Sequence, residues 1–194
     1  MSVALLLRVL LWGWFFAAVA AGHWLALRHL PPAAVAGLAP ALAALLWMLT
    51  RRVSALRDWC DALDPRALVL LQVVRASGLY FLISEGAAEL PRGLALIAGA
   101  GDLVVAVMAL PVALAPISGE ARARAIRIWS VVSLLSLLAS AGELVRLGVA
   151  EPLRLLPFAV LPLSLYPTFL LPLLLAAQAV LLGRMMRRGD EPGV

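Results

Sequence analysis

Long apolar runs alternate with short segments rich in arginine and proline along almost the whole chain. An α-helix needs about 20 apolar residues to cross a hydrocarbon core of about 30 Å. The pattern therefore predicts about six membrane spans, over residues 3–27, 33–49, 66–84, 91–115, 128–144 and 167–183. Together they define an all-α, polytopic transmembrane helix bundle. Residues 1–188 form its single domain, and residues 189–194 are expected to be a disordered tail.

The first run has a second interpretation, because Ala18-Val19-Ala20 resembles the cleavage site of a secretory signal peptide. However, the apolar run continues past this site to Leu27. In addition, Arg8, the charge that should precede a signal core, lies inside the run. We therefore favour a membrane span, in which the Arg8 side chain reaches back toward the lipid headgroups.

Residues 53–64 have a different pattern, with apolar residues on one helical face and polar residues on the other. The apolar face carries Val53, Leu56, Trp59, Cys60 and Leu63. We expect a helix that lies on the membrane surface, either as a connector or as a docking helix for a partner. The segment contains one arginine and three aspartates, so attraction to anionic lipid does not explain it.

Prolines recur every five residues near the end of the chain, at Pro152, Pro157, Pro162, Pro167 and Pro172. Each interior proline removes a backbone hydrogen bond and clashes with the preceding turn, so a straight α-helix is excluded. Broken backbone is tolerated at membrane depth where protein buries it or where it lines a cavity. We predict that residues 153–166 form a broken or re-entrant segment before the last span.

Two charged residues, Arg75 and Asp102, lie inside the third and fourth predicted spans. A charge at the bilayer centre costs roughly 2.5 to 3.5 kcal/mol on insertion scales, so such residues are usually paired or functional. At about 1.5 Å per residue, Arg75 lies roughly 14 Å inward from Arg66, and Asp102 roughly 15 Å inward from Arg92. Because the two spans are antiparallel neighbours, both charges reach one depth. We predict that they form a buried pair.

The fifth predicted span carries a row of four serines, Ser130, Ser133, Ser136 and Ser140. At 100° per residue they lie within an arc of roughly 120° on one side of the helix. Such a row usually marks a packing face whose hydroxyls bond to their own helix. The alternative is that the serines line a polar cavity. The candidate intramembrane polar site therefore consists of Arg75, Asp102, Ser130, Ser133, Ser136 and Gln178.

The composition supports a membrane protein, since 64% of the residues are hydrophobic and the mean hydropathy is +1.01. Soluble proteins contain about 45 to 50% apolar residues. The net charge of +5 comes from sixteen basic residues, all of them arginine. Because these arginines lie mostly at helix ends, we attribute them to membrane orientation and expect no nucleic-acid partner. The one cysteine, Cys60, excludes an intramolecular disulfide.

The arginines also predict the orientation of the bundle. One side of the membrane would carry eleven: Arg8, Arg51, Arg52, Arg57, Arg66, Arg122, Arg124, Arg127, Arg184, Arg187 and Arg188. The other side would carry Arg28, Arg92, Arg146 and Arg154. Because cytoplasmic loops carry the excess of positive charge, both termini are predicted to be cytoplasmic.

The residues from 71 to 178 resemble an uncharacterised family of small bacterial multi-pass inner-membrane proteins. The likeness rests on Arg75 with Gly78, on Glu89-Leu90-Pro91, on Ala98-Gly99-Ala100-Gly101-Asp102, on Trp129, and on residues 162–169 with Pro172. The last motif, which follows the pattern PLSLxPTFxxP, is the most distinctive. The resemblance implies a multi-pass protein of the bacterial inner membrane and brings no known activity.

The chain departs from this family at three positions. Relatives often have Asn after the tryptophan, an acidic residue one helical face further on, and His in the last span. The corresponding residues here are Ser130, Ser136 and Gln178. If the family has an intramembrane site, this member keeps Arg75 and Asp102 and lacks the more reactive companions.

Three classes of function remain to be weighed. An enzyme needs a nucleophile with a base, a metal cluster or a tuned carboxylate pair, and we find none. His23 and His29 are six residues apart and share no helical face, so we expect no catalytic residues, metal or cofactor. The favoured function is a structural or accessory subunit with a membrane-protein partner or a second copy of itself. The alternative is a small proton- or cation-coupled transporter, or a membrane-embedded binding protein, that uses Arg75 and Asp102.

Overall fold

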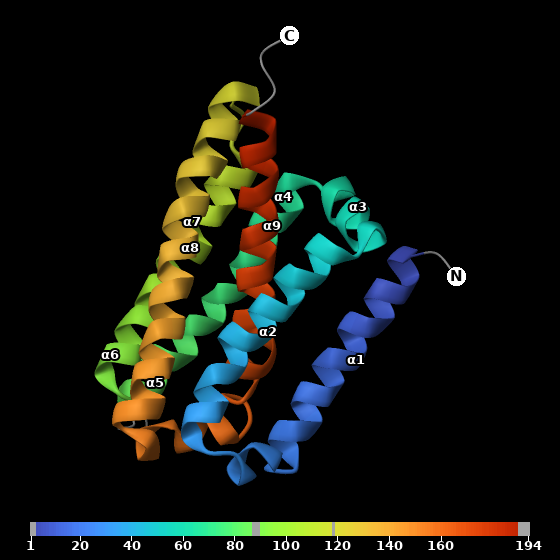
Figure 1. Ribbon diagram of the computed structural model, residues 1–194. Helices are drawn as coiled ribbons and strands as arrows, with labels where there is room; N and C mark the ends of the chain where they lie inside the picture. Colours follow the sequence, from blue (N-terminus) through green and yellow to red (C-terminus); the bar gives the residue numbers. More distant parts are fainter. Residues whose placement is uncertain (1–2, 87–89, 118, 190–194) are drawn as a thin grey trace.

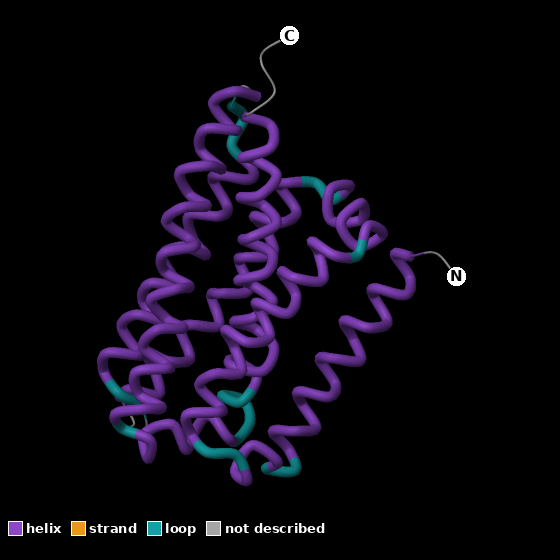
Figure 2. Tube along the Cα trace, in the orientation of Figure 1, coloured by secondary structure: helices purple, strands orange, loops and turns teal. Residues whose placement is uncertain are grey.

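The computed structural model describes residues 3–86, 90–117 and 119–189, and these residues form helices joined by short turns (Figures 1 and 2). Six stretches are long and apolar enough to cross a membrane: Ala4–His23, Pro32–Arg52, Pro65–Ser84, Arg92–Leu114, Gly119–Ala150 and Tyr166–Arg187. For the described residues, the prediction of an all-helical fold with six helices long and apolar enough to span a membrane is therefore confirmed. Most of the predicted tail, residues 190–194, lies outside the described residues.

The first helix, α1 (Val3–His23), lies at the edge of the bundle (Figure 1). Only 6% of its most apolar 18-residue stretch is buried inside the protein, against 44% for the corresponding stretch of the span Arg92–Leu114. Its side chains reach the bundle at Trp14, whose Nε1 donates to the carbonyl oxygen of Thr168 at 3.0 Å and whose ring packs on Phe169. The short 3₁₀ helix η1 (Ala26–His29) then turns the chain into the next span.

The second span, α2 (Pro32–Arg52), is followed by α3 (Ser54–Ala62), which lies across the end of the bundle (Figure 1). α3 corresponds to the amphipathic segment predicted for the membrane surface. Its C-terminal end is fastened to the last helix, because Arg184 Nη1 donates to the carbonyl oxygens of Leu63 at 2.7 Å and Cys60 at 3.3 Å. Carbonyl groups at the end of a helix have no partner within the helix, and a cationic donor satisfies them.

The third and fourth spans change helical geometry in mid-course. The third comprises α4 (Pro65–Leu71), the 3₁₀ helix η2 (Gln72–Gly78) and α5 (Leu79–Gly86). The fourth comprises α6 (Arg92–Leu94), the π-helix η3 (Ala95–Gly101) and α7 (Asp102–Leu114). Arg75 lies in the 3₁₀ helix η2 of the third span. Asp102 is the first residue of α7 and directly follows the π-helix η3 of the fourth span.

The fifth span is longer than predicted, because α8 runs from Gly119 to Ala150, 32 residues in all, instead of 128–144. The prediction assigns residues 117–127 to a loop, but residues 120–127 contain mostly good helix formers and no Gly or Pro. At 1.5 Å per residue the helix is about 48 Å long, well beyond a hydrocarbon core of about 30 Å. Its first turns therefore extend outside the apolar region.

The proline-rich segment contains no straight α-helix. It forms a 3₁₀ helix, η4 (Pro152–Ala159), a turn with a cis Leu161–Pro162 peptide, and a π-helical turn, η5 (Tyr166–Leu170), that leads into α9 (Leu171–Gly189). The turn crosses the end of the bundle opposite α3 (Figure 1). Phe158 is fully buried and packs against Phe81 and Tyr166, so this end of the bundle is filled by aromatic rings.

Candidate functional site: a buried arginine–aspartate pair

Arg75 and Asp102 are in direct contact in the interior of the bundle. The Nε and Nη2 atoms of Arg75 both donate to Oδ1 of Asp102, with Nε at 3.2 Å. Each residue is only 1% exposed. The two charges, which the helical rise per residue predicts to lie at the same depth in the membrane, are thus paired in the structure.

Glycines allow the two helices to approach closely at this point. A Cβ built on Gly78 would lie 2.8 Å from the carbonyl oxygen of Ala98 and 3.1 Å from the Cβ of Asp102. A Cβ on Gly99 would lie 3.1 Å from the carbonyl oxygen of Gly78. Small residues at such a crossing bring membrane helices into backbone contact. The short separation lets the Arg75 side chain reach Asp102 without crossing an apolar gap.

Every N–H group of Arg75 has an acceptor in the protein. Besides the two bonds to Asp102, Nη1 donates to the hydroxyl of Ser133 at 2.8 Å and to the Ser133 carbonyl oxygen at 3.3 Å. Nη2 donates to the hydroxyl of Ser136 at 2.8 Å. An arginine has five such donors, so the guanidinium is saturated.

The carboxylate of Asp102 is bonded on both oxygens. The Ser136 hydroxyl lies 3.5 Å from Oδ1, and the Tyr166 hydroxyl donates to Oδ2 at 3.4 Å. The Tyr166 ring packs edge to face on Phe81 at 4.7 Å, so one side of the pair is closed by aromatic rings. We call Arg75, Asp102, Ser133, Ser136 and Tyr166 the Arg75 network. It links the third, fourth and fifth spans to the start of the last one.

The serine row of α8 faces this network. The sequence pattern favours hydroxyls bonded to their own helix, whereas the Ser133 and Ser136 hydroxyls accept from Arg75. The physical reason is that a buried guanidinium without acceptors is costly, and a hydroxyl forms a stronger hydrogen bond with a charged donor than with a neutral group. The hydroxyls of Ser130 and Ser140 are buried and have no hydrogen-bond partner among the described residues.

Gln178 joins α9 to the same face of α8. Its Nε2 donates to the carbonyl oxygen of Ser130 at 2.7 Å, and its Oε1 lies 3.4 Å from the Ser133 hydroxyl. Gln178 therefore reaches the Arg75 network through Ser133. All six candidate residues, Arg75, Asp102, Ser130, Ser133, Ser136 and Gln178, lie in one polar cluster, with the Ser130 side chain contributing no bond of its own.

The sequence analysis missed Tyr166, which belongs to the Arg75 network, and Gln72, a further buried polar residue of the third span. The Nε2 of Gln72 donates to the carbonyl oxygen of Leu174 at 3.3 Å, and its Oε1 has no partner among the described residues. It stands three residues before Arg75 as a polar residue in an apolar run, and that position could have signalled it. Tyr166 had no comparable signal, because its place against Asp102 depends on the path of the proline-rich turn.

The chemistry of the cluster is that of a satisfied ion pair. Within the described part of the chain, no group of three or more His, Cys, Asp or Glu residues could hold a metal ion. The Arg75 network offers a carboxylate that is already bonded and serines whose neighbour is a cation. Ser133 and Ser136 both lie next to the Arg75 guanidinium, and Ser136 also lies 3.5 Å from Asp102 Oδ1.

Fold and site together define a multi-pass helical membrane protein with a buried intramembrane ion pair. A family model described as Domain of unknown function (DUF8737) matches residues 32–186, and the chain belongs to this family. The match begins at the first residue of α2 and contains the whole Arg75 network, whereas α1 lies outside it. No curated protein and no solved structure matches the chain.

Proposed function

We propose that this protein is a non-enzymatic structural or accessory subunit of a membrane assembly, in which the Arg75 network holds the bundle together. The observation that carries the proposal is the saturation of Arg75. Its five donors are used by Asp102, Ser133 and Ser136, so none is left for a substrate. A binding site would keep at least one donor or acceptor for its ligand.

The location and orientation belong to the same proposal. The arginine count favours cytoplasmic termini, and the resemblance described above favours the bacterial inner membrane. The first turn of α1 and the last turn of α9 lie at the same end of the bundle, as an even number of spans requires (Figure 1). The partners are the lipid bilayer and either a membrane protein or a second copy of the chain.

A specific observation favours a second candidate, a small proton- or cation-coupled transporter. Several buried polar atoms have no hydrogen-bond partner among the described residues, among them Gln72 Oε1 and the hydroxyls of Ser130, Ser140 and Ser164. Buried polar atoms without a protein partner are common sites for water or an ion. The 3₁₀ and π-helical stretches η2 and η3 also flank the pair, and such stretches often mark hinges or functional sites.

Native mass spectrometry separates the two candidates when the protein is gently extracted from its own membranes at natural abundance. The accessory-subunit proposal expects a stoichiometric protein partner in the spectrum. A lone protomer or homo-oligomer that carries a small ligand would contradict it and support the transport or binding alternative. The mass of that ligand would then identify the molecule to test in transport assays.

A further inference from the structure

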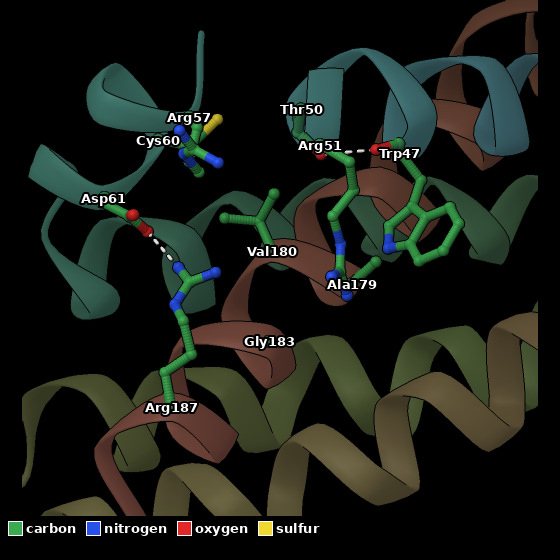
Figure 3. Close-up of a pocket in the computed structure, with 10 residues that line it drawn as sticks. All are labelled: Trp47, Thr50, Arg51, Arg57, Cys60, Asp61, Ala179, Val180, Gly183 and Arg187. Atoms are coloured by element: carbon green, nitrogen blue, oxygen red, sulfur yellow. Dashed lines mark hydrogen bonds and ion pairs between the residues drawn. The ribbon is translucent and has the colours of Figure 1, made fainter. Parts of the chain in front are cut away.

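A basic pocket lies at the α3 end of the bundle, far from the Arg75 network. It is bounded by the last turns of α2, by α3 and by the C-terminal half of α9 (Figure 3). We call it the α3 pocket and define it by Trp47, Thr50, Arg51, Arg57, Gly183 and Arg187. Two consecutive helices, α2 and α3, and the distant α9 thus contribute arginines to one small hollow.

The balance of charge in the α3 pocket is positive. Arg187 is neutralised by Asp61 across 2.5 Å, which is the ion pair drawn in Figure 3. Among the described residues, neither Arg51 nor Arg57 has a carboxylate partner, although the Arg51 guanidinium lies 5.0 Å from the centre of the Trp47 ring. Two uncompensated guanidinium groups therefore border the pocket. Guanidinium groups are the protein's best match for phosphate oxygens.

The acidic residues of α3 do not cancel this charge. Of its two aspartates, Asp61 lines the pocket and is held by Arg187, whereas Asp58 does not line the pocket. Asp64, which follows α3, accepts from the backbone N–H of Arg66 at 2.9 Å as the N-cap of α4. The expectation that α3 does not attract anionic lipid came from its own charge alone. The folded pocket also draws charge from Arg51 of α2, and Asp61, its acidic lining residue, is paired with Arg187.

The pocket is placed where a lipid headgroup would lie. The apolar run of α2 ends at Arg52, so Arg51 stands at the boundary between hydrocarbon and headgroups. Trp47, one turn further inward, is 48% exposed, and tryptophan prefers this boundary. Leu45 and Met48, on either side of Trp47 in the sequence of α2, are similarly exposed and offer an apolar surface for acyl chains.

The geometry points to a binding site for one anionic phospholipid, with its phosphate held by Arg51 and Arg57 and its acyl chains along the outer face of α2. Basic pockets between membrane helices bind anionic headgroups in this way. The site is preformed, because Arg184 fastens α3 to α9 through the carbonyl oxygens of Cys60 and Leu63. This inference is independent of the function proposed for the Arg75 network.

The test is a lipid titration followed by native mass spectrometry of the full-length protein in detergent. The probes are phosphatidylglycerol, phosphatidylcholine and the water-soluble glycerol 3-phosphate. The test variant is Arg51→Gln/Arg57→Gln. The control is Arg52→Gln/Arg124→Gln, which removes the same charge from exposed arginines at the same end of the bundle that do not line the pocket. All four arginines are exposed, so both variants are expected to fold.

The wild-type protein and the control should bind one phosphatidylglycerol more tightly than phosphatidylcholine, and the test variant should lose at least about tenfold in affinity for it. Equal loss in the control and the test variant would overturn the site, because the effect would then be net charge. Equal binding of the two lipids by the wild type would overturn it as well. If glycerol 3-phosphate displaces the lipid at equal concentration, the pocket binds a soluble phosphate and the lipid assignment is wrong.

Discussion

Gly78 lies against the backbone of Ala98, so closely that a Cβ at position 78 would be 2.8 Å from the Ala98 carbonyl oxygen. This contact sets the distance between the third and fourth spans. Arg75 stands three residues before Gly78, almost one turn away, and Asp102 stands four residues after Ala98. The close approach of the two backbones is therefore what puts the guanidinium within reach of the carboxylate.

Replacing Gly78 with alanine should force these helices apart. The obstruction is backbone, which cannot move aside like the end of a flexible side chain, and overpacking typically costs about 1 to 3 kcal/mol. We expect Gly78→Ala to lower the free energy of unfolding by about that amount, measured by SDS denaturation in mixed micelles. The matched control is Gly142→Ala in α8, where a Cβ meets nothing within 4 Å. It should be neutral or slightly stabilising.

Two serines one turn apart on α8 should respond differently to the loss of their hydroxyls. Ser133 accepts from Arg75 at 2.8 Å, and a hydrogen bond to a charged group contributes about 1.5 to 3 kcal/mol. Ser130 is equally buried, but its hydroxyl has no hydrogen-bond partner in the described part of the chain. In the same denaturation assay, Ser133→Ala should therefore be clearly destabilising, whereas Ser130→Ala should change stability by less than about 0.5 kcal/mol.

The opposite order would change the interpretation of the cluster. A marked loss of stability in Ser130→Ala would mean that its hydroxyl holds something that the protein alone does not supply, such as a bound water or ion. That result would favour the transport alternative over the structural one.

The sequence predicted the spans and the buried pair because both depend on simple physics. Hydrophobic length selects membrane helices, and a rise of 1.5 Å per residue puts Arg75 and Asp102 at one depth in antiparallel neighbours. The serine row was also visible, since helical periodicity puts Ser133 and Ser136 on one face. Their bonding partner was not, because a side chain's choice between its own helix and a neighbouring guanidinium is decided by packing.

Other features of the fold and the site depend on tertiary contacts, which the periodicity of apolar and polar residues in the sequence does not indicate. Tyr166 reaches Asp102 because of the turn through Pro162, whose path cannot be read from the spacing of prolines. The 3₁₀ and π-helical stretches around Arg75 and Asp102 reflect local hydrogen-bond register in a packed helix pair. The length of α8 was underestimated because the end of an apolar run was taken as the end of the helix.

The attachment of α3 to α9 should be measurable through the single cysteine. Cys60 is buried, and this burial, together with the neighbouring Asp61, raises the pKa of its thiol, while Arg184 opposes the rise. A raised pKa means less thiolate at neutral pH than in the unfolded chain. Maleimide labelling of the native protein should therefore be slow and should keep increasing at pH values where the rate of the unfolded chain has levelled off.

Arg184→Met should release α3 and speed up this labelling by about tenfold or more, since two bonds from a charged donor are lost. Removing the arginine by itself would raise the pKa of the Cys60 thiol further and slow the reaction. Faster labelling can therefore only come from exposure of the thiol. Arg124→Met, at an exposed position of α8, is the control and should leave the rate unchanged. An unchanged rate in Arg184→Met would show that α3 is held by other contacts.

The predicted orientation can be tested with cysteines at the two ends of the bundle. In a Cys60→Ala background, Arg154→Cys should react with a membrane-impermeant maleimide added to intact cells. Arg124→Cys should react only after the membrane is permeabilised, because the arginine-rich end is expected in the cytoplasm. Labelling of Arg124→Cys alone in intact cells would reverse the orientation.

The central claim is that Arg75 and Asp102 act as one structural unit, and a double-mutant cycle with Arg75→Gln and Asp102→Asn tests it most directly. Either single change leaves a buried charge without its partner and should cost about 3 to 5 kcal/mol of unfolding free energy. The double variant removes both charges, so we predict that it is more stable than either single variant. Losses that simply add in the double variant would contradict the account and identify Asp102 as a site that acts independently of Arg75.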